Sequence, residues 1–545
     1  MTAPPSADDG TSRRSNLVLL LLLVLFMLVT VLSSPGITVT LDEPLHFHYG
    51  LFILQGKSDR IDDSSMPVSA LNALPSYLAS YLPGGLLKEV LGRYFVARLI
   101  TIVIAALFAV VVFRWSEALY GFVPAVFSTT LYVLDPNLIA HAQLVTTDVF
   151  ASGMMALSMY LLWRFANSRN AIDGLICAIV IGLSQLVKYT AVALFPLCIA
   201  TLLLHDAPLV GSTFRERGIQ GMRRYTVRIG AYSIAMMAIA ALILNVGFLF
   251  NRSFTHLRDY RFRSELFRSL QSQLHSLGGI PVPIPYPYLE GLDWMRDTEQ
   301  SASRYGNVYL LGRLNKPSGF PGYYFVASAL KVPIATQVIV LAALGGFLVD
   351  RRRRSRFLRD EVFLLLPVAL LTIYFNFFFN AQTGIRYYLV VFPLLYVFAG
   401  SLFVDWVKRS AWARAGGALL LVYLAASVLS YFPHFTPYFN EFVWDKTKTY
   451  KYLSDTNLDW GQSEGDLQRY LAENPDAVYD PVDVQAGRLV VGGSDLVGIL
   501  EAPARYAWLR DNFEPTDTIA YSYFVYVISP QEIAKLCATT EYCQE

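Results

Sequence analysis

The sequence predicts a polytopic α-helical membrane protein with a small α/β domain at its C-terminal end. Of its 545 residues, 54% are hydrophobic and only 16% are charged, whereas roughly 25% are charged in an ordinary soluble domain. The hydrophobic residues come in runs of about 20, the length that an α-helix needs to cross a bilayer. The net charge of +2 gives no reason to expect nucleic acid as a partner.

Eleven hydrophobic segments are long enough to be membrane spans. The first, residues 16–34, follows Arg13 and Arg14, and no small-x-small cleavage site comes after its long apolar part. We therefore expect an uncleaved span rather than a signal peptide. The other predicted spans are residues 94–113, 118–135, 149–165, 171–187, 189–204, 229–250, 323–349, 361–380, 386–404 and 413–432.

Lysine and arginine residues in the short loops set the predicted orientation, because they are in excess on the cytoplasmic side. With the N-terminus inside, every short basic cluster also lies inside. These clusters are Arg13 and Arg14; Arg114; Arg164 and Arg169; Arg215, Arg217, Arg223, Arg224 and Arg228; Arg351 to Arg354, Arg356 and Arg359; and Lys408, Arg409 and Arg414. We therefore expect an inner tail of residues 1–15, a membrane domain of residues 16–432 with outer loops 35–92 and 251–320, and an outer C-terminal domain of residues 433–545.

The outer segments carry signals for secondary structure. Residues 42–55 are predicted to form a helix, and residues 67–82 form an apolar helix suited to the membrane interface. In the C-terminal domain, the pattern predicts a helix over residues 464–472 and strand-like runs at 488–492 and 518–528. This mixture predicts a small α/β fold.

The four cysteines fall into two pairs. Cys177 and Cys198 lie in apolar segments and are expected to be small buried residues. Cys537 and Cys543 either form a disulfide, if that end of the chain faces an oxidising compartment, or remain free. No Cys and His spacing typical of a metal site occurs in the sequence.

The stretch from Thr40 to Gly50 places titratable side chains directly after the first span. They are Asp42, Glu43, His46 and His48. Such groups are costly to desolvate beside a hydrophobic segment, so they need partners or a function. They form either a catalytic site at the membrane–water boundary or a solvated loop that caps the next helix.

Further charged residues lie at the outer ends of later spans. Asp148 follows soon after His141 and opens the fourth predicted span, where it is either a site residue or a helix cap. Lys188, Lys331 and Arg386 lie on the face that the positive-inside rule leaves poor in cations. Each cation alone is consistent with snorkelling, but three of them near acids indicate a site for an anion.

In this order, the motifs resemble those of the GT-C superfamily of glycosyltransferases that use polyprenyl-phosphate sugars. Within it, they resemble the family of protein O-mannosyltransferases and bacterial lipid A aminoarabinose transferases. The motifs are Asp42-Glu43-Pro44 with His46; His141 to Asp148; Lys188-Tyr189; Gly322-Tyr323-Tyr324 with Lys331-Val-Pro333; Gly384-Ile-Arg386-Tyr387; and Tyr438-Phe-Asn440-Glu441 with Asn457-Leu-Asp459-Trp460-Gly461-Gln462. Each motif is short, and the resemblance depends on their order and common side.

The resemblance implies separate roles for the acids. Asp42 corresponds to the outer acid that serves as general base and takes the proton of the acceptor hydroxyl. Glu43 is expected to orient Asp42 or bind the acceptor, and Asp148 to hold the donor sugar or the acceptor. The residues expected to bind sugar or acceptor are His46, His141, Tyr387, Asp459 and Trp460. For the last two, a turn followed by a helix cap is the alternative interpretation.

The implied donor is a sugar on a polyprenyl phosphate in the outer leaflet, with inversion at the anomeric carbon. Its phosphate leaves with negative charge, which a preorganised cation stabilises. Lys331 and Arg386 are the expected cations, with Lys188 as the third. The lipid tail needs an apolar groove, which we expect residues 67–82 and the outer aromatic rim to line. That rim is Tyr323, Tyr324, Phe325, Tyr387 and Tyr388.

The resemblance implies no cofactor besides the donor. Some superfamily members hold a divalent metal with acids and a histidine, and Asp42, Asp148, His46 and His141 are suitable residue types. Relatives in this branch do not depend on a metal, so we expect none. The acceptor is a protein, a glycolipid or a cell-wall glycan, and the expected location is a bacterial cytoplasmic membrane with the site facing the exterior.

Two other functions remain open from the sequence. A transporter or flippase of lipid-linked glycans predicts discontinuous helices with charges near the membrane midplane. A non-catalytic envelope assembly protein predicts that only the outer domain is essential.

Overall fold

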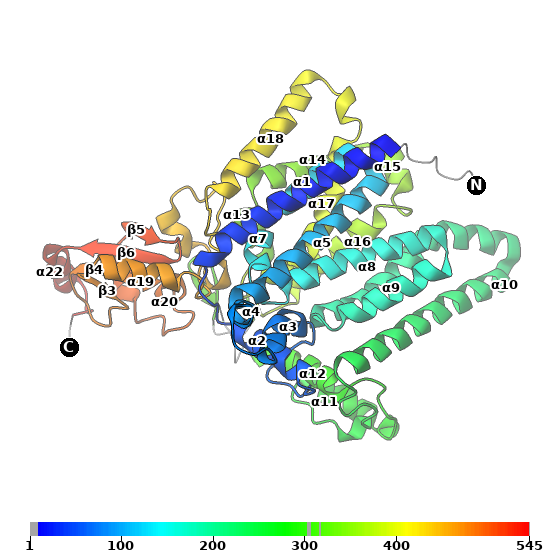
Figure 1. The fold of residues 1–545 in the computed structure, drawn as a ribbon, viewed down its shortest axis with the longest axis horizontal. Coiled ribbons are helices and arrows are strands. Elements are labelled where there is room, and N and C mark those ends of the chain that lie inside the picture. The colour runs from blue at the N-terminus through cyan, green and yellow to red at the C-terminus, as the bar shows by residue number, and fades with distance from the viewer. Residues whose placement is uncertain (1–8, 302–306, 316–317, 544–545) are drawn as a thin grey trace.

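The computed structural model describes residues 9–301, 307–315 and 318–543. It is a bundle of helices with a small β-sheet at the opposite end of the molecule from the N-terminus (Figure 1). Residues 1–8 of the predicted inner tail lie outside the described residues. So do the other positions between and after these ranges, which belong to the predicted outer loop 251–320 and to the C-terminal end.

Seven apolar stretches of the described chain are long enough to cross a membrane, or up to nine if each of two bent helix pairs counts as one span. The seven lie in α1 (Asp9–Ser33), α5 (Tyr94–Tyr120), α8 (Asp148–Ser168), the two halves of α10 (Leu194–Gly247), α17 (Phe392–Gly400) with the 3₁₀ helix Ile385–Val391 before it, and α18 (Ala411–Leu429). Two shorter apolar helices are α9 (Ala171–Ser184) and α16 (Val362–Phe377). The multi-pass helical fold is confirmed, while the count of eleven spans and the orientation stay predictions.

Proline accounts for the two bent pairs. Helices α6 (Phe122–Val133) and α7 (Pro136–Ala142) meet at 60°, and α13 (Tyr323–Lys331) and α14 (Ile334–Val349) meet at 118°. Pro333 has no N–H to continue α13 and holds the residue before it in an extended conformation. The sharp bend leaves Lys331 at the very end of α13.

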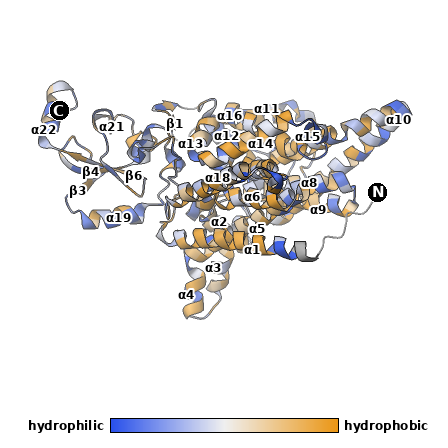
Figure 2. Cartoon of the chain, turned by 90° about the horizontal axis from the view of Figure 1, so that it is seen from above, coloured by the Kyte–Doolittle hydropathy of each residue, from blue (hydrophilic) through white to orange (hydrophobic). Residues whose placement is uncertain are grey.

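The helices expected in the first outer segment are confirmed as α2 (Glu43–Leu54) and α3 (Ser69–Ser80), and α4 (Leu86–Gly92) follows. Figure 2 shows α3 and α4 projecting from the body of the molecule. The predicted outer loop 251–320 contains elements that the sequence pattern did not indicate. They are α11 (Glu265–Gln273), α12 (Tyr286–Ser301), β1 (Val308–Leu310) and β2 (Arg313–Asn315). A one-turn basic helix, α15 (Arg351–Arg356), follows α14.

The C-terminal segment forms a four-stranded sheet of order β3-β4-β6-β5, in which only β3 and β4 are parallel. The elements are α19 (Glu464–Glu473), β3 (Ala477–Tyr479), β4 (Gly487–Gly492), α20 (Gly493–Leu496), α21 (Ala507–Asn512), β5 (Asp517–Ile519), β6 (Tyr523–Ile528) and α22 (Pro530–Thr539). The predicted helix 464–472 and strand 488–492 are confirmed. The run 518–528 is not one strand, because Ala520 and Tyr521 adopt positive φ and turn the chain back on itself.

Near the C-terminus, Cys537 and Cys543 form a disulfide, with 5.2 Å between their Cα atoms. Cys177 and Cys198 are buried free thiols, as expected.

The bundle and the C-terminal segment share one continuous hydrophobic core. Leu389 of the bundle, Tyr438 and Leu458 of the connecting segment and Phe524 of β6 all belong to this core, and all are fully buried. The C-terminal segment is therefore packed against the bundle rather than tethered to it.

Candidate active site

A cavity of about 690 Å³ opens where the bundle meets the C-terminal segment. Part of its wall is polar and charged, with Asp42, His46, Asp148, Lys188, Arg386, Tyr387, Asp455, Thr456, Asp459 and Trp460. The rest is apolar and comes mainly from α10 and α16, with Pro196, Leu197, Ala200, Leu370, Leu371, Tyr374 and Phe375. Leu370 and Tyr374 are about two-fifths exposed, at 42% and 39%, so the apolar part reaches the outer surface of the bundle.

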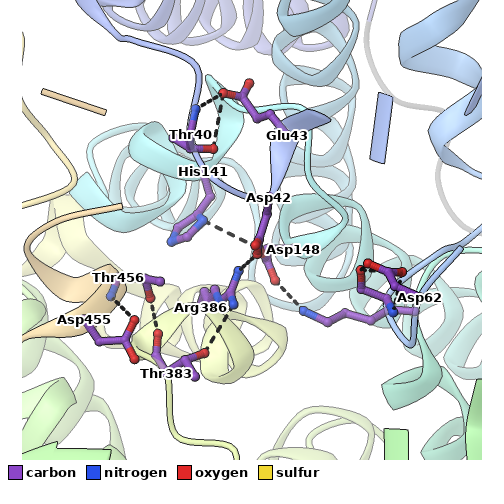
Figure 3. Close-up of polar contacts among 12 residues, drawn as sticks. Thr40, Asp42, Glu43, Asp62, His141, Asp148, Thr383, Arg386, Asp455 and Thr456 are labelled. Atoms are coloured by element: carbon purple, nitrogen blue, oxygen red, sulfur yellow. Dashed lines mark hydrogen bonds and ion pairs between the residues drawn. The ribbon is translucent and has the colours of Figure 1, made fainter. Parts of the chain in front are cut away.

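Asp42 and Arg386 form the first ion pair of the polar wall (Figure 3). Asp42 lies directly before α2, whose first turn contains Pro44, and its Oδ2 accepts a hydrogen bond of 2.6 Å from Arg386 Nη1. The Arg386 guanidinium also lies over the Trp460 ring, 4.4 Å from its centroid. Its buried Nε has no hydrogen-bond partner among the described residues. Its Nη2 donates a hydrogen bond of 3.2 Å to the Thr383 hydroxyl, so contacts with Asp42, Thr383 and Trp460 hold the guanidinium in place.

Asp148 and Lys188 form the second ion pair of the wall. Asp148 is the first residue of α8, and its other carboxylate oxygen lies 3.7 Å from Nδ1 of His141. The Lys188 ammonium also lies over the ring of Tyr387, 4.2 Å from its centroid. The Asp148 carboxylate therefore binds side chains rather than capping α8. Of these residues, His141 alone does not line the cavity.

His46 projects from α2 into the cavity wall and is only 5% exposed. Burial lowers the pKa of His46 below its ordinary value, so the imidazole is neutral near pH 7. Its Nδ1 has no hydrogen-bond partner among the described residues. A neutral imidazole in this position can donate or accept one hydrogen bond to a ligand.

Glu43 lies outside the cavity, although it is next to Asp42 in the sequence. It is fully buried and forms an ion pair with Arg98 at 2.7 Å. Its two oxygens also accept hydrogen bonds from the backbone N–H groups of Thr40 and Val145, both at 2.9 Å. All of its contacts are within the protein, and they join the start of α2 to α5 and to the segment before α8.

Lys331 also lies outside the cavity, behind its wall. The side chain is 1% exposed, and its ammonium donates hydrogen bonds of 2.7 Å to the carbonyl oxygens of Thr436 and Asn457. The structure thus brings together Asp42, Asp148, Lys188 and Arg386 of the predicted catalytic and phosphate-binding residues, and leaves Glu43 and Lys331 apart.

Asp455 is the main cavity residue that the sequence analysis did not propose. It lies in the left-handed region at φ 61°, which aspartate tolerates better than most residues. One oxygen accepts a hydrogen bond from the Thr456 N–H at 2.7 Å. Burial raises the pKa of Asp455 and of Asp459 to about 6, although Arg386 opposes the shift at Asp455. The only sequence signal was its position just before the motif from Asn457 to Gln462.

The lining of the apolar part differs from the expectation. Of the predicted aromatic rim, Tyr387 lines the cavity, whereas Tyr323 and Tyr324 are buried in the bundle core. Residues 67–82 do not line it either. The apolar wall instead comes from α10 and α16, whose aliphatic residues do not differ in sequence pattern from those of any other span.

In the part of the chain that the structure describes, no group of three or more His, Cys, Asp or Glu side chains is placed to hold a metal ion. Asp42, Asp148, His46 and His141 thus do not form such a group.

The solved structures that are similar to this chain include an oligosaccharyltransferase and ArnT. An oligosaccharyltransferase of Archaeoglobus fulgidus, AglB, solved with an inhibitory peptide and a dolichol-phosphate, is 13% identical at a TM-score of 0.47, covering 83% of this chain and 59% of that one. ArnT of Cupriavidus metallidurans, bound to undecaprenyl phosphate, is 14% identical at a TM-score of 0.29, covering 93% of this chain and 97% of that one. The present chain spans little more than half the length of the oligosaccharyltransferase structures.

No curated protein matches the sequence significantly. Residues 86–222 match a family described as dolichyl-phosphate-mannose-protein mannosyltransferase. This segment carries Asp148 and Lys188, which line the cavity, and His141, which contacts Asp148. The resemblance of this membrane protein to the GT-C glycosyltransferases is therefore confirmed through its match, over residues 86–222, to the mannosyltransferase family.

Proposed function

We propose that this protein transfers a sugar from a polyprenyl phosphate to an acceptor hydroxyl at the outer face of a bacterial cytoplasmic membrane. The observation that carries the proposal is the two-part cavity. Its charged wall and its apolar wall between α10 and α16 adjoin each other, which suits a ligand with a charged head and a long hydrocarbon tail. The family match over residues 86–222 supports glycosyl transfer.

In the proposed complex, the donor phosphate binds Arg386 and Lys188. Both cations are oriented by aromatic rings and by carboxylates, so little reorganisation is needed when negative charge grows on the leaving phosphate. One N–H of each Arg386 Nη group is used for Asp42 and Thr383, so the second N–H of each is left for the phosphate. The polyprenyl chain lies along the apolar wall and leaves the bundle beside Leu370 and Tyr374.

Asp42 is the proposed general base. Its side chain is 34% exposed in the cavity, so an acceptor hydroxyl has access to it. The acceptor oxygen forms a bond to the anomeric carbon, the bond from that carbon to the phosphate oxygen breaks, and the phosphate leaves with the electron pair. The acceptor proton passes to Asp42, and attack opposite the phosphate inverts the anomeric centre.

The other residues of the polar wall have supporting roles in this proposal. Asp148 orients Lys188 and contacts the donor sugar or the acceptor, while His46, Tyr387 and Asp459 offer hydrogen bonds to hydroxyl groups. His141 contacts Asp148 of one ion pair, and Trp460 contacts Arg386 of the other. Glu43, which is fully satisfied inside the protein, holds the start of α2 and thus the position of Asp42. The acceptor remains a protein, a glycolipid or a cell-wall glycan.

The test is complementation in the native host, with the glycan profile of the envelope as the readout. An Asp42→Asn variant present in the membrane at the wild-type level is expected to lose one glycan species, which then identifies the product. The matched control is Asp405→Asn, since Asp405 is exposed and its side chain pairs with the nearby Lys408. A full profile with Asp42→Asn contradicts the assignment of the base.

A further inference from the structure

The C-terminal segment holds the backbone just before Arg386 at Thr383 and at Ile385. The Thr456 hydroxyl donates a hydrogen bond to the carbonyl oxygen of Thr383, and Oδ1 of Asn457 accepts one of 3.1 Å from the Ile385 N–H. Between them stands Gly384 at φ 119°, where any Cβ would overlap the Thr456 hydroxyl. This close approach requires a glycine.

Asn457 is itself fixed by hydrogen bonds of its side chain and its carbonyl oxygen. Its Nδ2 donates hydrogen bonds to the Tyr323 hydroxyl at 2.9 Å and to the Ser454 carbonyl at 3.0 Å. Its backbone carbonyl accepts the bond from Lys331 described above. The residue is 1% exposed. Because both amide hydrogens and the amide oxygen are used, the side chain has a single orientation, and it fixes the Ile385 amide in turn.

The same C-terminal segment also contacts the arginine side chain, because Trp460 covers one face of the guanidinium. The C-terminal segment thus fixes Arg386 in two ways: hydrogen bonds hold the backbone at Thr383 and Ile385, and the Trp460 ring packs against the guanidinium. Its Nη1 then reaches Asp42, which belongs to the opposite end of the sequence.

We propose that Asn457 is a positioning residue for Arg386, acting through the Ile385 amide, so that binding of the donor phosphate requires the docked C-terminal segment. The inference rests on the proposed function for its consequence, but the positioning is a property of the protein alone. It gives a role to the motif from Asn457 to Gln462. It also gives one to Lys331, which donates a hydrogen bond to the Asn457 carbonyl oxygen.

Hydrogen–deuterium exchange of the full chain in lipid nanodiscs tests the positioning without any ligand. The Asn457→Ala variant is expected to exchange faster in peptides that contain the Ile385 amide, because that N–H loses its acceptor. Asn440→Ala is the matched control: Asn440 is an equally buried amide of the same segment, but it bonds the carbonyls of Ala329 and Val332. Unchanged exchange around Ile385 in Asn457→Ala overturns the inference.

Binding of undecaprenyl phosphate to the same nanodiscs tests the consequence. Loss of the buried hydrogen bond should weaken binding about tenfold in Asn457→Ala. The double variant with Arg386→Ala should bind no more weakly than Arg386→Ala alone, because the two residues act as a unit. Additive losses contradict the inference.

If Asn457→Ala does not fold, Gly384→Ala is the second variant: its Cβ overlaps the hydroxyl of Thr456, the residue before Asn457, so it displaces the same segment and should also weaken binding. If Arg386→Ala binds the lipid as well as the wild type does, the phosphate role in the proposed function fails. The exchange experiment still decides whether Asn457 positions Arg386.

Discussion

Asp42 and Glu43 are adjacent carboxylates, and each pairs with an arginine, yet their surroundings differ completely. The Asp42 side chain is 34% exposed, faces the cavity and contacts Arg386. The Glu43 side chain has no exposed surface, and the protein satisfies both of its oxygens. A carboxylate with unused hydrogen-bonding capacity can exchange partners with a ligand, whereas a saturated one stabilises the fold.

The largest effect is expected from Asp42→Asn. Loss of a general base lowers the rate of transfer by about 10²–10⁴-fold, while the melting temperature should stay close to that of the wild type because Asp42 is partly exposed. Both quantities are measured on purified protein with a polyprenyl-phosphate sugar. A rate near that of the wild type would show that another group takes the proton.

Glu43→Ala should act on stability instead. It leaves Arg98 buried without its carboxylate, which costs about 3–5 kcal/mol, so we expect a much lower melting temperature or no folded protein in detergent. Arg98→Ala should give a similar loss, and the double variant should cost less than the sum of the two. A stable Glu43→Ala variant that has lost only activity would place Glu43 in contact with substrate.

A smaller effect is expected in the apolar part of the cavity. Ala200→Phe should fill part of the cavity beside the apolar wall of α10 and α16. It should weaken binding of undecaprenyl phosphate by about tenfold, since several buried CH₂ groups of the lipid are displaced. Geranyl phosphate, with a much shorter tail, should bind as before. Ala413→Phe on the exposed face of α18 is the control. Equal losses for both lipids would place the tail elsewhere.

The smallest effect concerns pH. Burial raises the pKa of Asp459 to about 6, above the value of roughly 3.9 in an unfolded chain, so the folded state binds this proton more tightly. The resulting stability is present below pH 4 and is lost as the pH rises through 6. Asp459→Asn should therefore raise the melting temperature at pH 8 more than at pH 4. The exposed Asp476→Asn is the control, and equal shifts at both pH values contradict the assignment.

The membrane fold was predictable because a long apolar run forms a helix whatever its neighbours are, but the 118° bend between α13 and α14, inside the predicted span 323–349, was not predicted. The roles of adjacent charges were not, because they depend on partners far away in the sequence. Glu43 forms an ion pair with Arg98 and accepts a hydrogen bond from the Val145 N–H. Lys331 donates hydrogen bonds to the carbonyl oxygens of Thr436 and Asn457. A backbone carbonyl is present at every residue, so no sequence pattern marks such a partner.

The part of the cavity wall that comes from the C-terminal segment changes how a deletion experiment must be interpreted. Removal of residues 450–545 would take Asp455, Asp459 and Trp460 from the cavity wall. Loss of function after that deletion therefore cannot distinguish an enzyme from a non-catalytic assembly protein, whereas single substitutions in the bundle can.

Two segments far apart in the sequence, residues 38–41 and 460–465, pair beside the site. The Thr38 N–H donates to the Gln462 carbonyl, the Leu41 N–H donates to the Trp460 carbonyl, and the Gly465 N–H donates to the Thr38 hydroxyl across 427 residues of sequence. Ribosomes add roughly 5–20 residues per second, so about 20–85 s pass between the synthesis of Thr38 and the synthesis of Gly465. The cavity wall is therefore incomplete throughout the insertion of the chain into the membrane, and a prematurely terminated product that lacks its last hundred residues also lacks Asp455, Asp459 and Trp460 of that wall.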